Sequence, residues 1–162
     1  MGFYSRSTMF IHAIISRSGM TKTRWEEQWA FMCKLGFSHA ECLSMFKKHP
    51  SSFVRSKENV HSRVKFFTVK QNFELSDIVK SPVILGLSLE KRIIPRCNVL
   101  DVLYSNGLIG SRNAGSLTTA WKLTEKEFIE KFVIKYQEVV LVIVSAYKSQ
   151  NRLADFKEEN GV

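Results

Sequence analysis

The sequence contains two stretches, 32 residues apart, that follow one pattern. Pro50 corresponds to Pro82, and each proline follows a lysine by two positions. An apolar residue stands three positions after each proline, and a serine, Ser56 or Ser88, stands six positions after it. A period in this range is typical of proteins built from stacked supersecondary units, which form extended binding surfaces more often than catalytic centres.

Each residue of this pattern has a local structural meaning. A proline ends the helix before it, because it lacks an N–H group and restricts the preceding residue. The apolar residue three positions later fits one 3₁₀ turn, and the serine is a typical N-cap for a new helix. One unit is therefore predicted to contain two α-helices with a proline-initiated 3₁₀ turn between them.

Other helix boundaries can be predicted along the chain. Ser/Thr-x-x-Glu capping boxes and simple serine caps both indicate helix starts. The boxes are expected at Thr23, Ser38 and Thr124, and the simple caps at Ser56, Ser76 and Ser88. Gly36 and Gly107 are expected to end helices. Pro95 lies seven residues after Ser88 and is expected either to kink that helix or to start a new one.

These signals predict an all-α array of repeats over residues 1–150. The clear units are expected at about 36–70 and 71–106, and an atypical last unit at about 107–150. Residues 151–162 are predicted to form a flexible polar tail. The apolar run 139–144 is too short to span a bilayer and is predicted to be buried, so no membrane insertion is expected.

The positive charge is concentrated in the repeated region. The chain has 24 Lys and Arg against 15 Asp and Glu, a net charge of +9. Residues 44–98 hold eleven of the basic residues and four of the acidic ones. This distribution favours a nucleic-acid or anionic-membrane partner, although a basic surface without a partner is the alternative.

The candidate nucleic-acid-binding residues are the basic side chains that flank the proline turns. They are Lys47, Lys48, Lys80, Lys91, Arg92 and Arg96. On a groove these side chains would neutralise phosphates, and the affinity would fall as salt rises. The alternative for each is a solvated helix surface or a salt bridge to Glu90.

No catalytic or metal-binding pattern is found in the sequence. The four histidines are scattered, with no Cys or acid at the spacing of metal ligands. No glycine-rich phosphate loop is present, and the three cysteines form no CxxC pair and are predicted to be reduced thiols. We therefore expect no enzyme, no cofactor and no metal.

Several segments resemble the plant-type mitochondrial transcription termination factor (mTERF) family. They are residues 81–96, Leu35–Ser38 leading to Met45–Pro50, and Gly107–Ile109, while residues 128–147 look like the family's C-terminal helix. The resemblance covers the chain from about Met9 to Tyr147, and it implies a short or truncated member of the family.

The resemblance also implies a fold and a function. Members are similar in being right-handed-type α-solenoids whose units hold two α-helices and a 3₁₀ turn. They lie in mitochondria or chloroplasts, bind double-stranded DNA through a basic concave groove, and regulate the initiation or termination of organelle transcription. The expected partner is therefore double-stranded DNA, bound by a monomer. No transit peptide is evident, since residues 9–15 are better interpreted as a helix of the mature protein.

Other functions remain open at this point. Some members of the resembled family act on organelle RNA, in splicing or processing. A protein-interaction solenoid that holds a polypeptide would explain the aromatic content and the apolar run 139–144. An inactive truncated copy is the last alternative.

Overall fold

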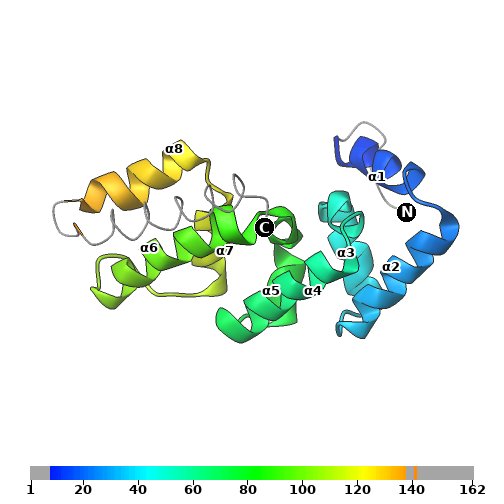
Figure 1. Cartoon of the computed structure of the whole chain (residues 1–162), viewed down its shortest axis with the longest axis horizontal. Helices are drawn as coiled ribbons and strands as arrows, with labels where there is room; N and C mark the ends of the chain where they lie inside the picture. Colours follow the sequence, from blue (N-terminus) through cyan, green and yellow to red (C-terminus); the bar gives the residue numbers. More distant parts are fainter. Residues whose placement is uncertain (1–7, 138–140, 142–162) are drawn as a thin grey trace, which may run out of the picture. The chain divides into compact units, whose positions relative to one another are not determined.

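The computed structural model of the chain describes residues 8–137 and Leu141 (Figure 1). All regular structure in these residues is helical, with no strand among them, so the predicted all-α class is confirmed. The predicted tail 151–162 lies outside the described residues. Of the apolar run 139–144 only Leu141 is described, and its side chain is 85% exposed.

The secondary structure consists of α-helices joined or continued by short 3₁₀ and π segments. The α-helices are α1 (Thr8–Ser18), α2 (Lys22–Lys34), α3 (His39–Lys48), α4 (Lys57–Lys65), α5 (Leu75–Lys80), α6 (Ile94–Ser105), α7 (Ala114–Lys122) and α8 (Glu125–Phe128). The 3₁₀ segments are η1 (Pro50–Phe53), η3 (Pro82–Gly86) and η6 (Ile134–Tyr136), and the π segments are η2 (Phe66–Lys70), η4 (Leu89–Ile93) and η5 (Ile129–Val133).

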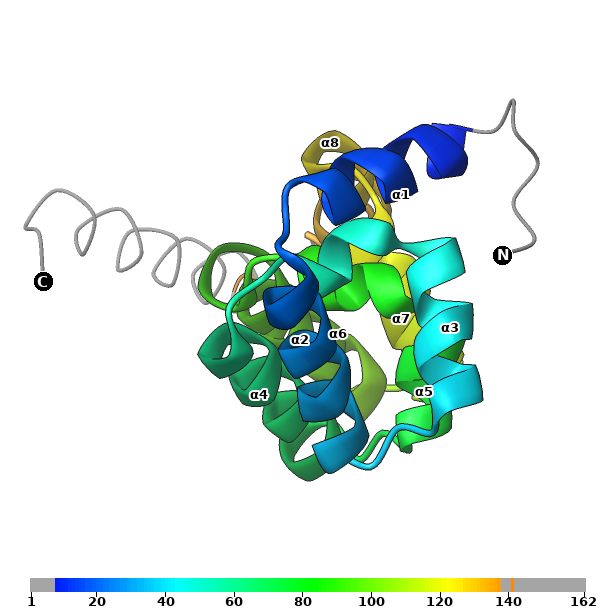
Figure 2. The ribbon, with the colours of Figure 1, turned by 90° about the vertical axis from the view of Figure 1, so that its right-hand side faces the viewer.

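The chain forms two compact units, Met1–Gly86 and Leu87–Val162. In unit 1, α1 contacts α3 and η1, and α3 lies against α5 (Figure 2). In unit 2, α6 contacts α7 and η5. The division after Gly86 falls inside the second predicted repeat, and the repeat bounds at 36–70, 71–106 and 107–150 stay predictions.

The predicted order of helix, proline turn and capped helix is confirmed. Pro50 begins η1 and Pro82 begins η3, and both prolines are buried. Ser56 accepts a hydrogen bond from the N–H of Asn59 and so caps α4. In the same way Ser88 accepts a hydrogen bond from the N–H of Lys91. The repeated sequence pattern therefore produces the same local structure twice.

Of the other predicted helix starts, two are confirmed and two are wrong. Ser38 and Thr124 form capping boxes with glutamates three residues later. In place of Thr23, Thr21 caps α2 and accepts a hydrogen bond from Arg24 N. A cap requires only a side-chain oxygen on an extended residue, so the Glu at the box position was not decisive. In place of Ser76, Glu74 caps α5, and Ser76 lies inside the first turn.

Pro95 lies inside a helix that continues through it. The chain runs from the Ser88 cap through η4 into α6, and Ile93 and Ile94 both keep right-handed helical dihedral angles. Ile93 N donates to Ser88 O at 3.0 Å, which is the wider i→i−5 pattern of a π turn. The π turn accommodates the missing proline N–H without ending the helix.

Gly36 and Gly107 end helices, as predicted. Their φ angles are +101° and +66°, in the left-handed region that favours glycine. The N–H of Gly36 bonds to Cys33 O, and the N–H of the next residue reaches back to Met32 O. This pair of bonds is a Schellman motif, and it is repeated around Gly107 at the end of α6.

Candidate nucleic-acid interface

Hydrogen bonds join the two proline turns of unit 1. Side chains at the first turn donate to backbone carbonyl groups at the second. Lys48 Nζ donates to Val79 O at 2.9 Å, Ser52 Oγ to Pro82 O at 3.1 Å, and Arg55 Nη2 to Gly86 O at 2.8 Å. The partners are 30 or 31 residues apart, so these bonds connect one repeat to the next.

Lys47, Lys48 and Lys80 lie at the C-terminal ends of helices in unit 1. Lys47 and Lys48 are in the last turn of α3, half-buried and exposed respectively, and Lys80 is in the last turn of α5. Lys80 Nζ forms an ion pair with Asp77 at 3.0 Å, but its side chain is 73% exposed. Cations at these positions stabilise the helix dipole. An ammonium has three donors, so Lys48 and Lys80 can also contact a phosphate.

Lys91 and Arg92 lie in the π turn η4 of unit 2. Lys91 is exposed. Arg92 is half-buried, and its Nη2 donates to Leu123 O at 3.1 Å. Burial and the neighbouring Arg96 lower the pKa of Arg92, while Glu125 raises it. One guanidinium has five N–H donors, so Arg92 retains donors for a second acceptor.

Arg96 is placed differently from the prediction. Its side chain is 1% exposed, so it has almost no surface to offer a phosphate. Nη1 donates to the carbonyl oxygens of Ala120, Trp121 and Leu123 at 2.7 to 3.1 Å, and Nη2 donates to Glu125 at 2.9 Å. The guanidinium also lies 4.5 Å from the centre of the Phe128 ring. Arg96 therefore caps the C-terminal end of α7 and connects α6 to α8, which is a structural role.

The candidates do not form one cluster within either unit alone. Lys47, Lys48 and Lys80 belong to unit 1, and Lys91 and Arg92 belong to unit 2. Sequence reasoning missed Arg55, which binds the second proline turn. The repeat comparison gave no signal for it, because the corresponding residue 32 positions later is Leu87.

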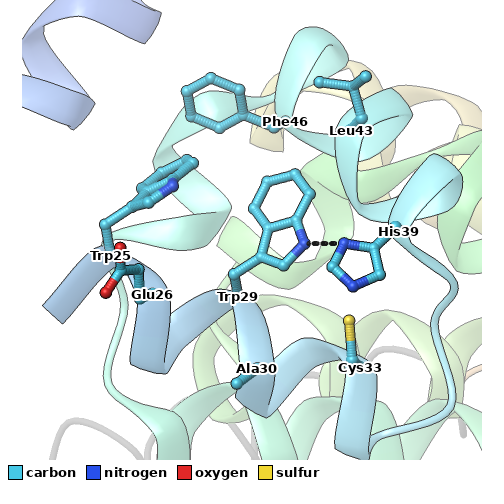
Figure 3. Close-up of a pocket in the computed structure, with 8 residues that line it drawn as sticks. All are labelled: Trp25, Glu26, Trp29, Ala30, Cys33, His39, Leu43 and Phe46. Atoms are coloured by element: carbon cyan, nitrogen blue, oxygen red, sulfur yellow. Dashed lines mark hydrogen bonds between the residues drawn. The ribbon is translucent and has the colours of Figure 1, made fainter. Parts of the chain in front are cut away.

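An aromatic pocket of about 580 Å³ lies between α2 and α3 (Figure 3). Trp25 and Trp29 of α2 face Phe46 of α3, with 5.5 Å between the centres of the two indole rings. Trp29 Nε1 donates to Nδ1 of His39 at 2.8 Å, so Nδ1 is unprotonated in this arrangement. Half-exposed aromatic rings can stack on a nucleobase or hold an apolar side chain.

A second pocket, of about 620 Å³, lies in unit 2 and is rich in hydroxyl groups. Tyr104 donates to Ser116 Oγ at 2.8 Å, and Tyr136 donates to Leu108 O at 3.2 Å. Ser116 in turn forms a capping box with Asn113 at the start of α7. These hydroxyl groups are used within the protein, so the pocket has a structural explanation.

Cys42 and Cys97 are buried and are not arranged for reactivity. Burial raises the pKa of Cys42 and of Cys97 to about 12, so both are protonated at neutral pH. Within the described ranges, no group of three His, Cys, Asp or Glu side chains could hold a metal ion. None of the helices in these ranges is long and apolar enough to cross a membrane.

The fold is that of an all-α helical-repeat protein with basic residues beside its proline turns. The model of the mTERF family matches residues 12–129, and the chain belongs to this family. It is also similar to the protein named "Transcription termination factor MTERF15, mitochondrial" of Arabidopsis thaliana, with 29% identity over 107 residues. That alignment covers 66% of this chain but 24% of the relative, so the chain spans about a quarter of that protein's length. No solved structure matches the chain.

Proposed function

We propose that this chain binds double-stranded DNA and takes part in the control of transcription in mitochondria. The observation that carries the proposal is membership of the mTERF family. The name of the Arabidopsis relative, a mitochondrial transcription termination factor, supports the process and the organelle. We further propose that the protein acts as a monomer and without catalysis, by occupying its target.

The proposed contacts are electrostatic. Lys47, Lys48, Lys80, Lys91 and Arg92 are exposed or half-buried, and each has donors for phosphate oxygens. Neutralising phosphates releases condensed counterions, which makes the affinity strongly dependent on salt. Arg96 is not included, because its guanidinium is buried.

The test is to measure duplex DNA binding at several salt concentrations. We expect the logarithm of the association constant to fall linearly with the logarithm of the salt concentration. The triple variant Lys47→Ala, Lys48→Ala and Lys80→Ala should bind more weakly and with a shallower slope, reduced by roughly one for each phosphate contact that is lost.

The matched control removes three other lysines. Lys34, Lys122 and Lys126 are exposed and lie outside the candidate set. Their replacement by alanine changes the net charge by the same amount. Equal weakening by the two triple variants would show that only total charge matters, and affinity that does not change with salt would contradict the proposal.

The aromatic pocket favours a second candidate function, the binding of single-stranded RNA. Stacking of one base on an aromatic side chain contributes roughly 1–3 kcal/mol. If RNA is the ligand, unlabelled single-stranded RNA should displace duplex DNA, and Trp29→Ala should weaken RNA binding selectively. Absence of binding to both nucleic acids would favour a protein-interaction role or an inactive copy.

A further inference from the structure

We infer that unit 1 contains a pocket for one phosphate group of a nucleic-acid backbone, between the N-terminal ends of α2 and α4. The identity of the ligand rests on the proposed function. None of the residues that line this pocket is among the candidate nucleic-acid-binding residues described above. Its volume is about 440 Å³. The residues that carry the argument are Thr21, Arg24, Gln28, Arg55, Ser56 and Lys57, all of which line it.

Two buried donors in this pocket have no acceptor. Gln28 is 4% exposed, and its Nε2 has no hydrogen-bond partner among the described residues. Arg55 Nε is likewise buried and without a partner, while Arg55 Nη2 is held by Gly86 O. Buried polar groups are nearly always hydrogen-bonded, because an unpaired donor loses its hydration without compensation. Neither nitrogen has accessible surface in this arrangement, so the side chains over them must move before a ligand with acceptor oxygens can satisfy both donors.

Two helix N-termini open onto the same pocket. Thr21 caps α2 and Ser56 caps α4, each accepting a hydrogen bond from the third N–H of its helix. The first two N–H groups of each helix have no intrahelical acceptor. The capping hydroxyl groups also keep their own protons for donation. Both helix dipoles place partial positive charge here, which is the usual environment of a bound phosphate.

The charges lining the pocket favour a singly charged anion. Lys57 Nζ is paired with Glu27 at 3.0 Å, so these two charges cancel. Arg24 and Arg55 remain, against the exposed Glu58. One net positive charge and two helix dipoles suit a phosphodiester, which carries one negative charge and two unesterified oxygens.

The direct test is a titration of the whole ¹⁵N-labelled chain followed by NMR. The side-chain amide of Gln28 and the Nε–H of Arg55 each give their own signal, so both orphan donors are observable. Dimethyl phosphate serves as the phosphodiester probe, with inorganic phosphate and duplex DNA in separate titrations and acetate at equal ionic strength as the control anion. We expect saturable shifts of both signals with dimethyl phosphate and with the duplex, and markedly smaller ones with acetate.

Two separate variants test the site, so that the test still stands if one of them does not fold. Gln28→Glu is isosteric and puts a carboxylate in the pocket. Arg24→Glu changes an exposed residue in the first turn of α2, where an acid favours the helix. Each should raise the dissociation constant for dimethyl phosphate by at least about tenfold, because like charges a few Å apart repel. Lys34→Glu, which makes the same charge change at the other end of α2, should leave it unchanged.

The outcomes distinguish a failure of the phosphate pocket from a failure of the proposed function. Duplex binding that leaves the Gln28 and Arg55 signals unmoved overturns the inference and leaves the proposed function standing. Saturable shifts with phosphates in a chain that does not bind duplex DNA overturn the nucleic-acid source and assign the pocket to free phosphate. Equal shifts with acetate, or none with any probe, overturn the phosphate site itself.

Discussion

Arg55 Nη2 lies 2.8 Å from the carbonyl oxygen of Gly86, although the two residues are 31 positions apart. Gly86 also approaches the ring of His49 closely. A Cβ atom at position 86 would lie 3.1 Å from His49 Cε1 and 3.7 Å from Arg55 Nη2. The glycine therefore lets the first proline turn pack against the second.

Gly86→Ala should destabilise the protein. The added methyl group would push against the His49 ring and disturb the Arg55 hydrogen bond, and overpacking of this kind costs about 1–3 kcal/mol. The free energy of unfolding, measured by urea titration with circular dichroism, should fall by about that amount. Gly110→Ala is the control, because a Cβ there meets nothing within 4 Å. It should be neutral or slightly stabilising, and an equal loss in both variants would contradict the prediction.

Replacing Arg96 should cause a large loss of stability. Arg96→Met leaves three carbonyl groups of the α7 C-terminus and the carboxylate of Glu125 without their donor. The Glu125 side chain is 54% exposed and can be solvated, but the buried carbonyl groups lose their donor, and an unsatisfied buried acceptor costs about 1–3 kcal/mol. Lys126→Met is a matched control, because the Lys126 side chain is 85% exposed and its 3.9 Å pair with Glu130 is a surface ion pair. Surface substitutions usually change the free energy of unfolding by about 0.5 kcal/mol or less. A loss below about 1 kcal/mol for Arg96→Met would therefore contradict the capping role.

Two serines distinguish a true helix cap from a serine inside a helix. Ser88 accepts the N–H of Lys91, so Ser88→Ala should reduce the free energy of unfolding by about 1 kcal/mol. Ser76 lies within α5, and among the described residues its hydroxyl group donates to the Glu74 side chain alone, at 3.3 Å. Ser76→Ala should therefore be nearly neutral in the same urea titration. The reverse order would show that α5 begins at Ser76.

Stability should fall in acid partly through His49. Burial, then Arg55, then His12 lower the pKa of His49 from its ordinary value of 6.5. The unfolded chain therefore binds a proton more readily than the folded chain between the two pKa values, and the free energy of unfolding rises with pH in that window. The contribution is fully present above pH 6.5 and is lost as the pH falls through the folded pKa.

The measurement is the difference in unfolding free energy above and below pH 6.5. His49→Gln should reduce this difference, whereas His61→Gln, at an exposed position, should not. The His49 ring contacts Ser52 Oγ at 2.8 Å, and Ser52 donates its own proton to Pro82 O. His49 therefore donates from Nδ1, and Gln keeps a donor for this position. An unchanged pH difference in His49→Gln would contradict the assignment.

Local structure in this chain could be predicted from the sequence because it depends on neighbouring residues. Pro50 and Pro82 each end one helix and begin a 3₁₀ turn, because a proline limits its own backbone and that of the residue before it. Gly36 supplies a left-handed residue at a helix end. The errors at Thr23 and Ser76 were also local. Several hydroxyl and acidic residues near one helix start can serve as the cap, and only the packed structure selects among them.

By itself, the sequence determined the repeat, the all-α class and the location of the excess charge. The tertiary structure decided what each basic residue does. Arg96 and Lys91 look equivalent in the sequence, yet Arg96 is buried on carbonyl groups 24 to 27 residues away and Lys91 is exposed. The charge of a side chain is a property of the residue, but its burial and partners depend on segments that only folding brings together. For the same reason, the unpaired donors of Gln28 and Arg55 could not be predicted from the sequence.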